Sequence, residues 1–175
     1  QAKNPVVIQS HLKKLFAGIS KVQFSEGNAS ITAMCSLEGE VVPLLKPVAI
    51  SDAVESWLQL LSAQMKATLQ QRVADTLSAS GLDLERSASQ VLCVAEVVSF
   101  TRDCEAALGR GRGGLDALKK ELLGKLKEYT SYETDVELLS LKMKALVMDL
   151  IHHIDVVDQQ LAANTTSATD WAWRK

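Results

Sequence analysis

Two long apolar stripes at helical spacing constrain the fold of this chain more than any other feature. Between residues 133 and 162, apolar side chains recur at intervals of four, three, four, four, three and four positions, as Leu139, Met143, Leu146, Leu150, Ile154, Val157 and Leu161. The second stripe comprises Val54, Trp57, Leu58, Leu61, Met65, Leu69, Val73 and Leu77. Because residues at this spacing share one face of an α-helix, both segments predict long helices that pack against partners.

Three further segments have the pattern of a helix. Residues 5–19 start with Asn4 as a cap and Pro5 at the first helical position, and apolar residues follow at helical spacing. Residues 115–130 have leucines on one face and charged residues on the other. Residues 87–108 are apolar almost all round in their first half, which predicts the most buried helix of the fold. Periodicity alone also allows a strand there, but the length of the segment favours a helix.

A short region of different character follows the first helix. Residues 21–45 alternate apolar and polar side chains around two turn signals, Glu26-Gly27-Asn28 and Glu38-Gly39-Glu40. This pattern predicts an antiparallel meander of three strands. Pro43 and Pro47 either confine the third strand to an edge of the sheet or end it.

The sequence therefore predicts a mainly α fold. We expect a bundle or rod of about five helices, with the β-meander inserted after the first helix and the main helical bundle over residues 51–162. A chain of 175 residues with 47% hydrophobic content can bury a substantial core. The residues expected at the centre of that core are Trp57, Leu61, Val94, Val98, Leu146, Leu150 and Ile154.

Composition and charge argue against several classes of function. A formal net charge of −2 provides no basic surface for nucleic acid or anionic lipid. No run approaches the roughly 18–20 uncharged apolar residues that span a bilayer. The three cysteines, Cys35, Cys93 and Cys104, are widely spaced, which argues against a disulfide framework or a zinc site and favours a reducing compartment. We therefore expect neither a nucleic-acid partner nor a membrane partner.

Candidate catalytic and metal-binding patterns are weak. The glycine-rich run Gly109–Gly114 lacks the lysine and hydroxyl residue of a phosphate-binding loop, so a solvated loop between helices is the favoured interpretation. Asp149 and His153 lie four residues apart, a spacing that a metal could use, but a pair on the solvated side of a helix is favoured. The sequence predicts no catalytic residue, no metal site and no cofactor in this chain.

The last residues carry two of the three tryptophans. Trp171 and Trp173 alternate, so they mark either an extended strand or side chains that are buried where the chain docks on another domain. We expect residues 167–175, including Arg174 and Lys175, to form a junction with a domain outside this chain, of which residues 1–175 would be a piece.

Four segments resemble the linker region of dynein heavy chains, in the order in which that family has them: Asn4–Phe16, Ile31–Pro43, Val54–Leu58 and Asp170–Lys175. The last of these looks like the place where the linker enters the first AAA+ module, so the chain resembles the C-terminal portion of the linker. Within the family, Gln90–Glu96 and Ile151–Val157 look most like the cytoplasmic dynein of cilia, which drives retrograde intraflagellar transport.

The resemblance implies a mechanical role. In dyneins the linker lies across a ring of AAA+ modules, and it bends and straightens as the first module binds and hydrolyses ATP. By this resemblance the partner is the AAA+ ring of the same heavy chain, ATP and magnesium bind in those modules, and microtubules are bound by domains outside this chain. The implied location is the cytoplasm and cytoskeleton, including the cilium. The alternative is a free-standing helical adaptor that presents a groove to a partner helix.

Overall fold

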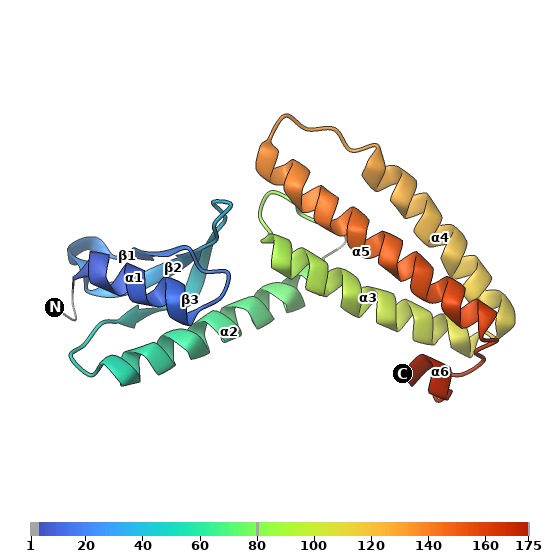
Figure 1. Cartoon of the computed structure of the whole chain (residues 1–175), viewed down its shortest axis with the longest axis horizontal. Helices are drawn as coiled ribbons and strands as arrows, with labels where there is room; N and C mark the ends of the chain where they lie inside the picture. Colours follow the sequence, from blue (N-terminus) through green and yellow to red (C-terminus); the bar gives the residue numbers. More distant parts are fainter. Residues whose placement is uncertain (1–3, 80, 175) are drawn as a thin grey trace. The chain divides into compact units, whose positions relative to one another are not determined.

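The computed structural model describes residues 4–79 and 81–174, except for the side chain of Arg112. The chain divides into two compact units, Gln1–Asp75 and Thr76–Lys175. The predicted fold class is confirmed: the described residues form mainly α-helices, with a small antiparallel sheet after the first helix (Figure 1). The first unit contains most of the second helix, whereas the sequence predicted one helical bundle over residues 51–162.

The first unit packs two helices with a three-stranded sheet. Its elements are α1 (Pro5–Leu15), β1 (Lys21–Phe24), the 3₁₀ turn η1 (Glu26–Asn28), β2 (Ser30–Cys35), β3 (Val41–Ala49) and α2 (Val54–Ser78). The strand order is β1-β2-β3 and both pairings are antiparallel. The core between these elements consists of Ile8, Leu12, Val22, Ile31, Met34, Leu44, Val48, Trp57, Leu61 and Met65.

The start of α1 agrees with the capping signal in the sequence. The side chain of Asn4 accepts a hydrogen bond from the backbone N–H of Val6 at 3.0 Å, and Pro5 opens the helix. The helix ends at Leu15, four residues before the predicted end, because the chain becomes extended at Phe16 and Gly18 adopts a φ of 83°.

Strand β3 continues through both of its prolines, to Ala49. It lies at an edge of the sheet, which is one of the two outcomes that the sequence left open for Pro43 and Pro47. On the opposite edge, the side chain of Gln9 binds the free backbone groups of β1. Its Nε2 donates to the carbonyl oxygen of Val22 at 2.7 Å, and its Oε1 accepts from the N–H of Val22 at 2.9 Å.

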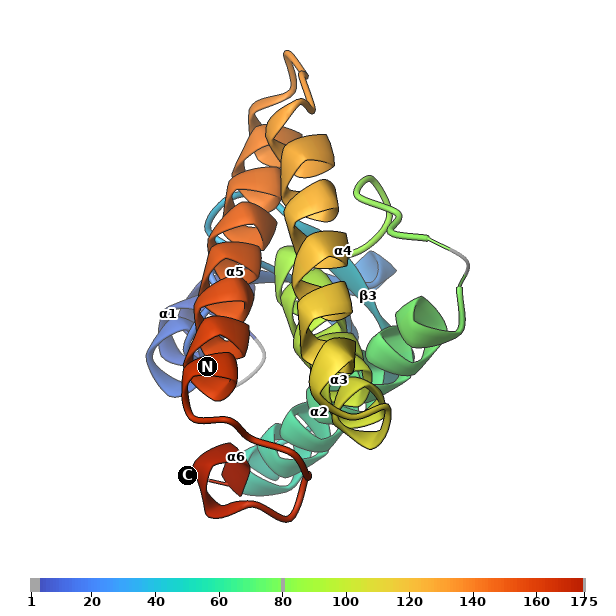
Figure 2. The same ribbon diagram turned by 90° about the vertical axis from the view of Figure 1, so that its right-hand side faces the viewer.

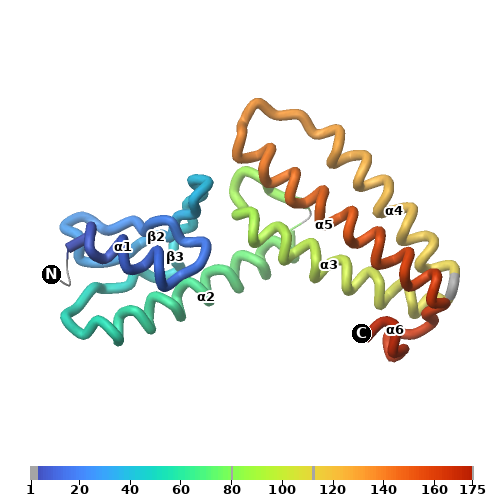
Figure 3. The backbone as a smooth tube through the Cα atoms, viewed as in Figure 1, coloured from blue at the N-terminus to red at the C-terminus, as the bar shows by residue number. Residues whose placement is uncertain are grey.

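The second unit is a bundle of three long helices and one short helix. Its elements are α3 (Ser89–Gly109), α4 (Arg112–Thr130), α5 (Glu137–Ala162) and α6 (Trp171–Arg174). Figures 2 and 3 show α3, α4 and α5 side by side, with α4 antiparallel to the other two. The core that they enclose consists of Phe100, Cys104, Ala107, Leu108, Leu115, Leu118, Leu122, Leu150, Ile154 and Val157.

The predicted core residues fall into two groups. Trp57, Leu61, Leu146, Leu150 and Ile154 are buried. Val94 and Val98, by contrast, do not lie in the core: Val94 is 41% exposed and Val98 is half-buried. The physical reason is that α3 is apolar around most of its circumference, while its partners α4 and α5 cover the face that carries Phe100, Cys104 and Ala107.

The glycine-rich run is not a solvated loop. Only Arg110 and Gly111 lie between α3 and α4, and Gly111 has a φ of 83° that suits glycine. Gly114 lies inside α4 and is buried against the end of α3. A Cβ at Gly114 would lie 2.8 Å from the carbonyl carbon of Ala107 and closer still to its oxygen. The glycines therefore permit a tight turn and a close approach of two helices.

Candidate functional site

The predicted junction at residues 167–175 is a turn followed by the short helix α6. The carboxylate of Asp170 accepts hydrogen bonds from the backbone N–H of Thr166 at 2.8 Å and of Ser167 at 3.1 Å, and from the Thr166 hydroxyl at 3.4 Å. The bond from the Thr166 amide, together with that from Ser167, lowers the pKa of Asp170 below its ordinary value. This acceptor closes the turn that leads into α6.

A second set of polar contacts fixes α6 to the end of α5. The Thr165 hydroxyl donates to Oε1 of Gln160 at 2.7 Å, and Nε2 of Gln160 donates to the carbonyl oxygen of Ala172 at 3.1 Å. Gln160 is buried, so both ends of its amide are satisfied inside the unit. The backbone of the terminal segment is thus held at a defined place at one end of the bundle (Figure 2).

The two terminal tryptophans have different surroundings. Trp173 is partly buried and packs against the core of the second unit, whereas Trp171 is 73% exposed. Of the two alternatives that the sequence left open, the extended strand is wrong, because Trp171–Arg174 forms a helical turn. Arg174 is exposed, and Lys175 lies outside the described residues. The segment therefore presents one large indole at the surface while the other is anchored.

A buried polar cluster links α3 to α4. Nζ of Lys125 lies 2.8 and 2.7 Å from the two carboxylate oxygens of Glu96, and the Tyr129 hydroxyl donates to Oε1 of Glu96 at 3.3 Å. The Glu96 side chain is 10% exposed and that of Lys125 is 35% exposed. Burial, with the Glu96 charge added, raises the pKa of Tyr129, so the phenol stays protonated and serves as a donor.

Sequence reasoning missed this cluster. Glu96 and Lys125 are 29 residues apart, and their pairing depends on how α3 and α4 are placed. One signal was available: Glu96 is the only charged residue between 91 and 98, in an otherwise apolar run. A carboxylate at such a position needs a partner, because burial of an unpaired charge is costly.

His153 is a buried histidine of the bundle and not a solvated one, which corrects the interpretation favoured from the sequence. Its ring stacks on Phe100 with centroids 4.0 Å apart and an interplanar angle of 6°. Burial lowers the pKa of His153, although the charges of Asp149 and Glu96 oppose that change. Within residues 4–79 and 81–174, no group of three or more His, Cys, Asp or Glu side chains is placed to hold a metal ion.

The stability of the second unit is expected to fall as the pH drops below about 6.5, the ordinary pKa of histidine. The unfolded chain binds a proton at His153 more readily than the folded chain does, so the stabilisation is complete above that pH and is lost towards the lower folded pKa. Urea unfolding followed by circular dichroism at about pH 7.5 and 5.5 measures the loss. His153→Phe should reduce the pH dependence, while the exposed control His152→Gln should keep it. Equal slopes for both variants would contradict this assignment.

The two thiols of α3 are poor nucleophiles near neutral pH. Burial raises the pKa of Cys104 to about 12, with the nearby charges of Asp103 and Glu105 adding to the effect. Burial also raises the pKa of Cys93 to about 11, and the side chain of Asp149 adds to this shift. Since the thiolate is the reactive form, both cysteines serve as small packing residues.

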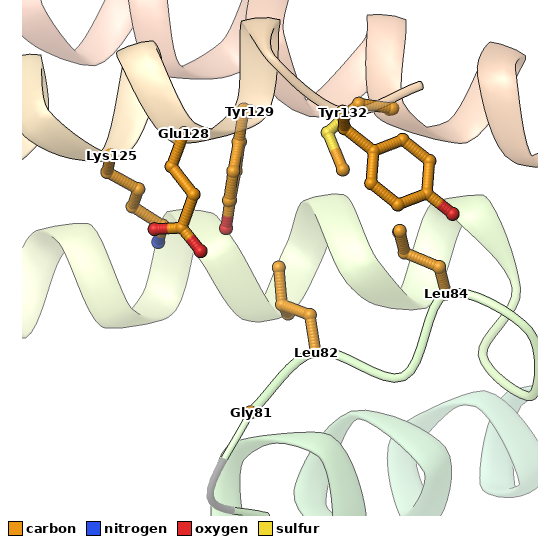
Figure 4. A pocket seen from close by; sticks show the side chains of 8 residues that line it. Gly81, Leu82, Leu84, Lys125, Glu128, Tyr129 and Tyr132 are labelled. Carbon is orange, nitrogen blue, oxygen red and sulfur yellow. The ribbon is translucent and has the colours of Figure 1, made fainter. Parts of the chain in front are cut away.

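A cavity of about 450 Å³ adjoins the Glu96–Lys125 pair (Figure 4). It lies between the end of α4 and the irregular segment 81–88, and it is lined by Gly81, Leu82, Leu84, Lys125, Glu128, Tyr129, Tyr132 and Met143. Lys142 holds this segment in place. Its buried ammonium group donates to the carbonyl oxygens of Leu84 and Ser87, both at 2.8 Å.

In the described part of the chain, none of the helices combines the length and the apolar character that a bilayer crossing requires.

The sequence is similar to dynein heavy chains. Residues 1–76 match the family model described as dynein heavy chain, N-terminal region 2. All 175 residues align at 47% identity with cytoplasmic dynein 2 heavy chain 1 of Caenorhabditis elegans. The human protein of that name is 45% identical over 190 aligned positions, which include the whole of this chain. The cytoplasmic dynein heavy chain of C. elegans is 31% identical over 98% of the chain.

The chain is thus similar along its length to a segment of dynein heavy chains, as the resemblance in the sequence predicted. It spans 4% of the length of each of these three relatives. The matched family model carries the name of the N-terminal region of the heavy chain. The match therefore supports a place in the N-terminal region, and it does not support the predicted assignment of this chain to the C-terminal portion of the linker.

Proposed function

We propose that this chain is a force-transmitting linker segment of a dynein motor heavy chain. The observation that carries the proposal is the terminal segment, where Trp173 is anchored on a packed helical bundle and Trp171 is presented at the surface. The similarity of the whole chain to cytoplasmic dynein 2 heavy chains supports the motor class and favours it over a free-standing adaptor. Trp171 and Arg174, with Lys175, would contact the AAA+ ring of the same heavy chain.

The second unit has the length and the close packing that a rigid lever requires. Helix α5 has 26 residues, so it extends over about 39 Å at 1.5 Å per residue. Leu150, Ile154 and Val157 along it are buried against α3 and α4. Close packing of this kind resists deformation, so a displacement at one end is transmitted to the other.

In this proposal, other parts of the heavy chain hydrolyse ATP and bind microtubules. ATP and magnesium would bind in the AAA+ modules, microtubules would be bound elsewhere, and this segment would have no ATPase site of its own. The similarity to cytoplasmic dynein 2 supports a location in the cytoplasm and the cilium.

Trp171→Ala in the full-length heavy chain is expected to lower microtubule gliding velocity several-fold at nearly unchanged ATP turnover. Because Trp171 is 73% exposed, the substitution should alter the stability of residues 1–175 by no more than about 0.5 kcal/mol. Gliding velocity and ATPase rate measured on the same preparation give the distance moved per ATP.

The matched control is Met148→Ala, which removes an exposed apolar side chain, 65% accessible, from the middle of α5. It should leave the distance moved per ATP unchanged. The proposal fails if Trp171→Ala and Met148→Ala give the same ratio as the unmodified motor, or if residues 1–175 alone hydrolyse ATP.

A further inference from the structure

The cavity beside α4 has two walls of different chemistry. Figure 4 shows the side chains of Lys125, Glu128, Tyr129 and Tyr132 along one wall, facing the segment that carries Leu82 and Leu84. Glu128 and Tyr132 are four residues apart at the end of α4, so they lie on the same side of the chain there. A ligand that enters the cavity therefore meets a carboxylate and an aromatic ring opposite aliphatic side chains.

Two of the residues that line the cavity are charged, and they have opposite signs: Lys125 and Glu128. Lys125 lines it, but its ammonium group already contacts both carboxylate oxygens of Glu96 and lies 5.3 Å from the centre of the Tyr129 ring. The positive charge of Lys125 is therefore matched by Glu96. Among the lining residues this leaves the carboxylate of Glu128, on an exposed residue at the rim, as the negative charge that a ligand can reach. The ammonium group of Lys142, behind the opposite wall, is already bound by the carbonyl oxygens of Leu84 and Ser87.

We propose that this cavity binds an arginine side chain presented by a second polypeptide. The Glu128 carboxylate would accept hydrogen bonds from the guanidinium group, and the Tyr132 ring would stack against its plane. The methylene groups of the arginine would lie against Leu82 and Leu84. This proposal goes beyond the linker function, and it holds or fails independently of it.

The guanidinium group fits this site better than other cations do. It is planar and more weakly hydrated than an ammonium group, so it can both stack on an aromatic ring and pair with a carboxylate. The Tyr132 side chain is available for such stacking, since the residue is 40% exposed. The contacts of Lys142 with Leu84 and Ser87 keep the opposite wall in place, so little order has to be created on binding.

The test is an NMR titration of ¹⁵N-labelled residues 1–175 with the peptide acetyl-Gly-Arg-Gly-amide. We expect saturable shifts of the amide signals of Glu128, Tyr129 and Tyr132 at peptide concentrations on the order of 10 mM or below. The same peptide with glutamine in place of arginine should bind about fivefold more weakly or worse, because it lacks the charge that pairs with Glu128.

Substitutions distinguish binding in this cavity from a general effect of the charge of the protein on peptide affinity. Glu128→Gln should weaken binding of the arginine peptide by about fivefold or more. Tyr132→Leu should also weaken it, because the stacking surface is lost. Glu121→Gln removes the same charge two turns earlier on α4, outside the cavity lining, and should change the affinity by less than about twofold.

Three results would each overturn the proposal: no saturable shift with the arginine peptide, equal affinity for the glutamine peptide, or equal weakening by Glu121→Gln and Glu128→Gln. Stronger binding of acetyl-Gly-Glu-Gly-amide would show that Lys125 governs the site, and this too would count against it. None of these outcomes bears on the gliding assay of Trp171→Ala, so the two proposals are judged separately.

Discussion

Replacement of Gly114 by alanine is expected to lower the free energy of unfolding of the second unit by about 3 kcal/mol. A Cβ at this position would lie 2.8 Å from the carbonyl carbon of Ala107 and closer to its oxygen. Neither atom belongs to a flexible side chain, so α3 and α4 would have to separate. That separation also strains the adjoining turn, in which the Ala107 carbonyl accepts the hydrogen bond of the Arg110 N–H at 3.0 Å.

The neighbouring glycine provides a matched control. Gly113 is exposed and lies in the same helical turn, and a Cβ added there would meet no heavy atom of another element within 4 Å. Gly113→Ala should therefore raise the stability by up to about 1 kcal/mol, since alanine is the better helix former. Chemical denaturation of both variants decides the point. If both variants were destabilised to a similar extent, the glycines would contribute to stability through backbone flexibility and not through close packing of α3 and α4.

Lys125→Met is the second substitution with a large expected effect. It leaves the carboxylate of Glu96, whose side chain is 10% exposed, without its cationic partner inside the bundle. Removal of one member of a buried ion pair costs about 3–5 kcal/mol. Because Lys125 itself is 35% exposed and water can reach this side of the pair, we expect the lower end, about 3 kcal/mol.

The double variant distinguishes loss of charge pairing from loss of packing. Glu96→Leu combined with Lys125→Met replaces the pair by apolar side chains and should recover most of the stability, since apolar replacements of buried pairs are often neutral. Lys120→Met, at an exposed position of the same helix, should change stability by less than about 0.5 kcal/mol. If Lys125→Met is no more destabilising than Lys120→Met, the pair does not stabilise the α3–α4 interface.

Much of the fold could be predicted from local patterns. The apolar stripe through Leu150 predicted α5 because its periodicity is a property of neighbouring residues, and the same holds for α2 and the stripe through Leu61. The cap at Asn4 is likewise local, and the predicted start of α1 agrees with the structure. Such patterns show which face of a helix or strand is apolar.

The features that sequence reasoning missed depend on residues far apart in the chain. Val94 belongs to an apolar helix, but its exposure depends on which side α4 and α5 occupy. Gly114 was interpreted as part of a loop because its role arises from the approach of Ala107. His153 was expected in solvent, although its stacking on Phe100 brings it into the bundle. In each case the position of a neighbouring helix decides the outcome.

The hydrogen bonds between Gln9 and Val22 affect how readily two copies of this chain can pair through the edges of their sheets. The backbone groups of an outer strand are a template on which another chain can add a strand. On β1 the Gln9 amide occupies both such groups of Val22, and on β3 two prolines lack the N–H that a new ladder requires. Neither edge strand therefore presents a continuous series of unpaired backbone N–H and C=O groups. Addition of a strand from a neighbouring molecule is disfavoured even at high local concentration.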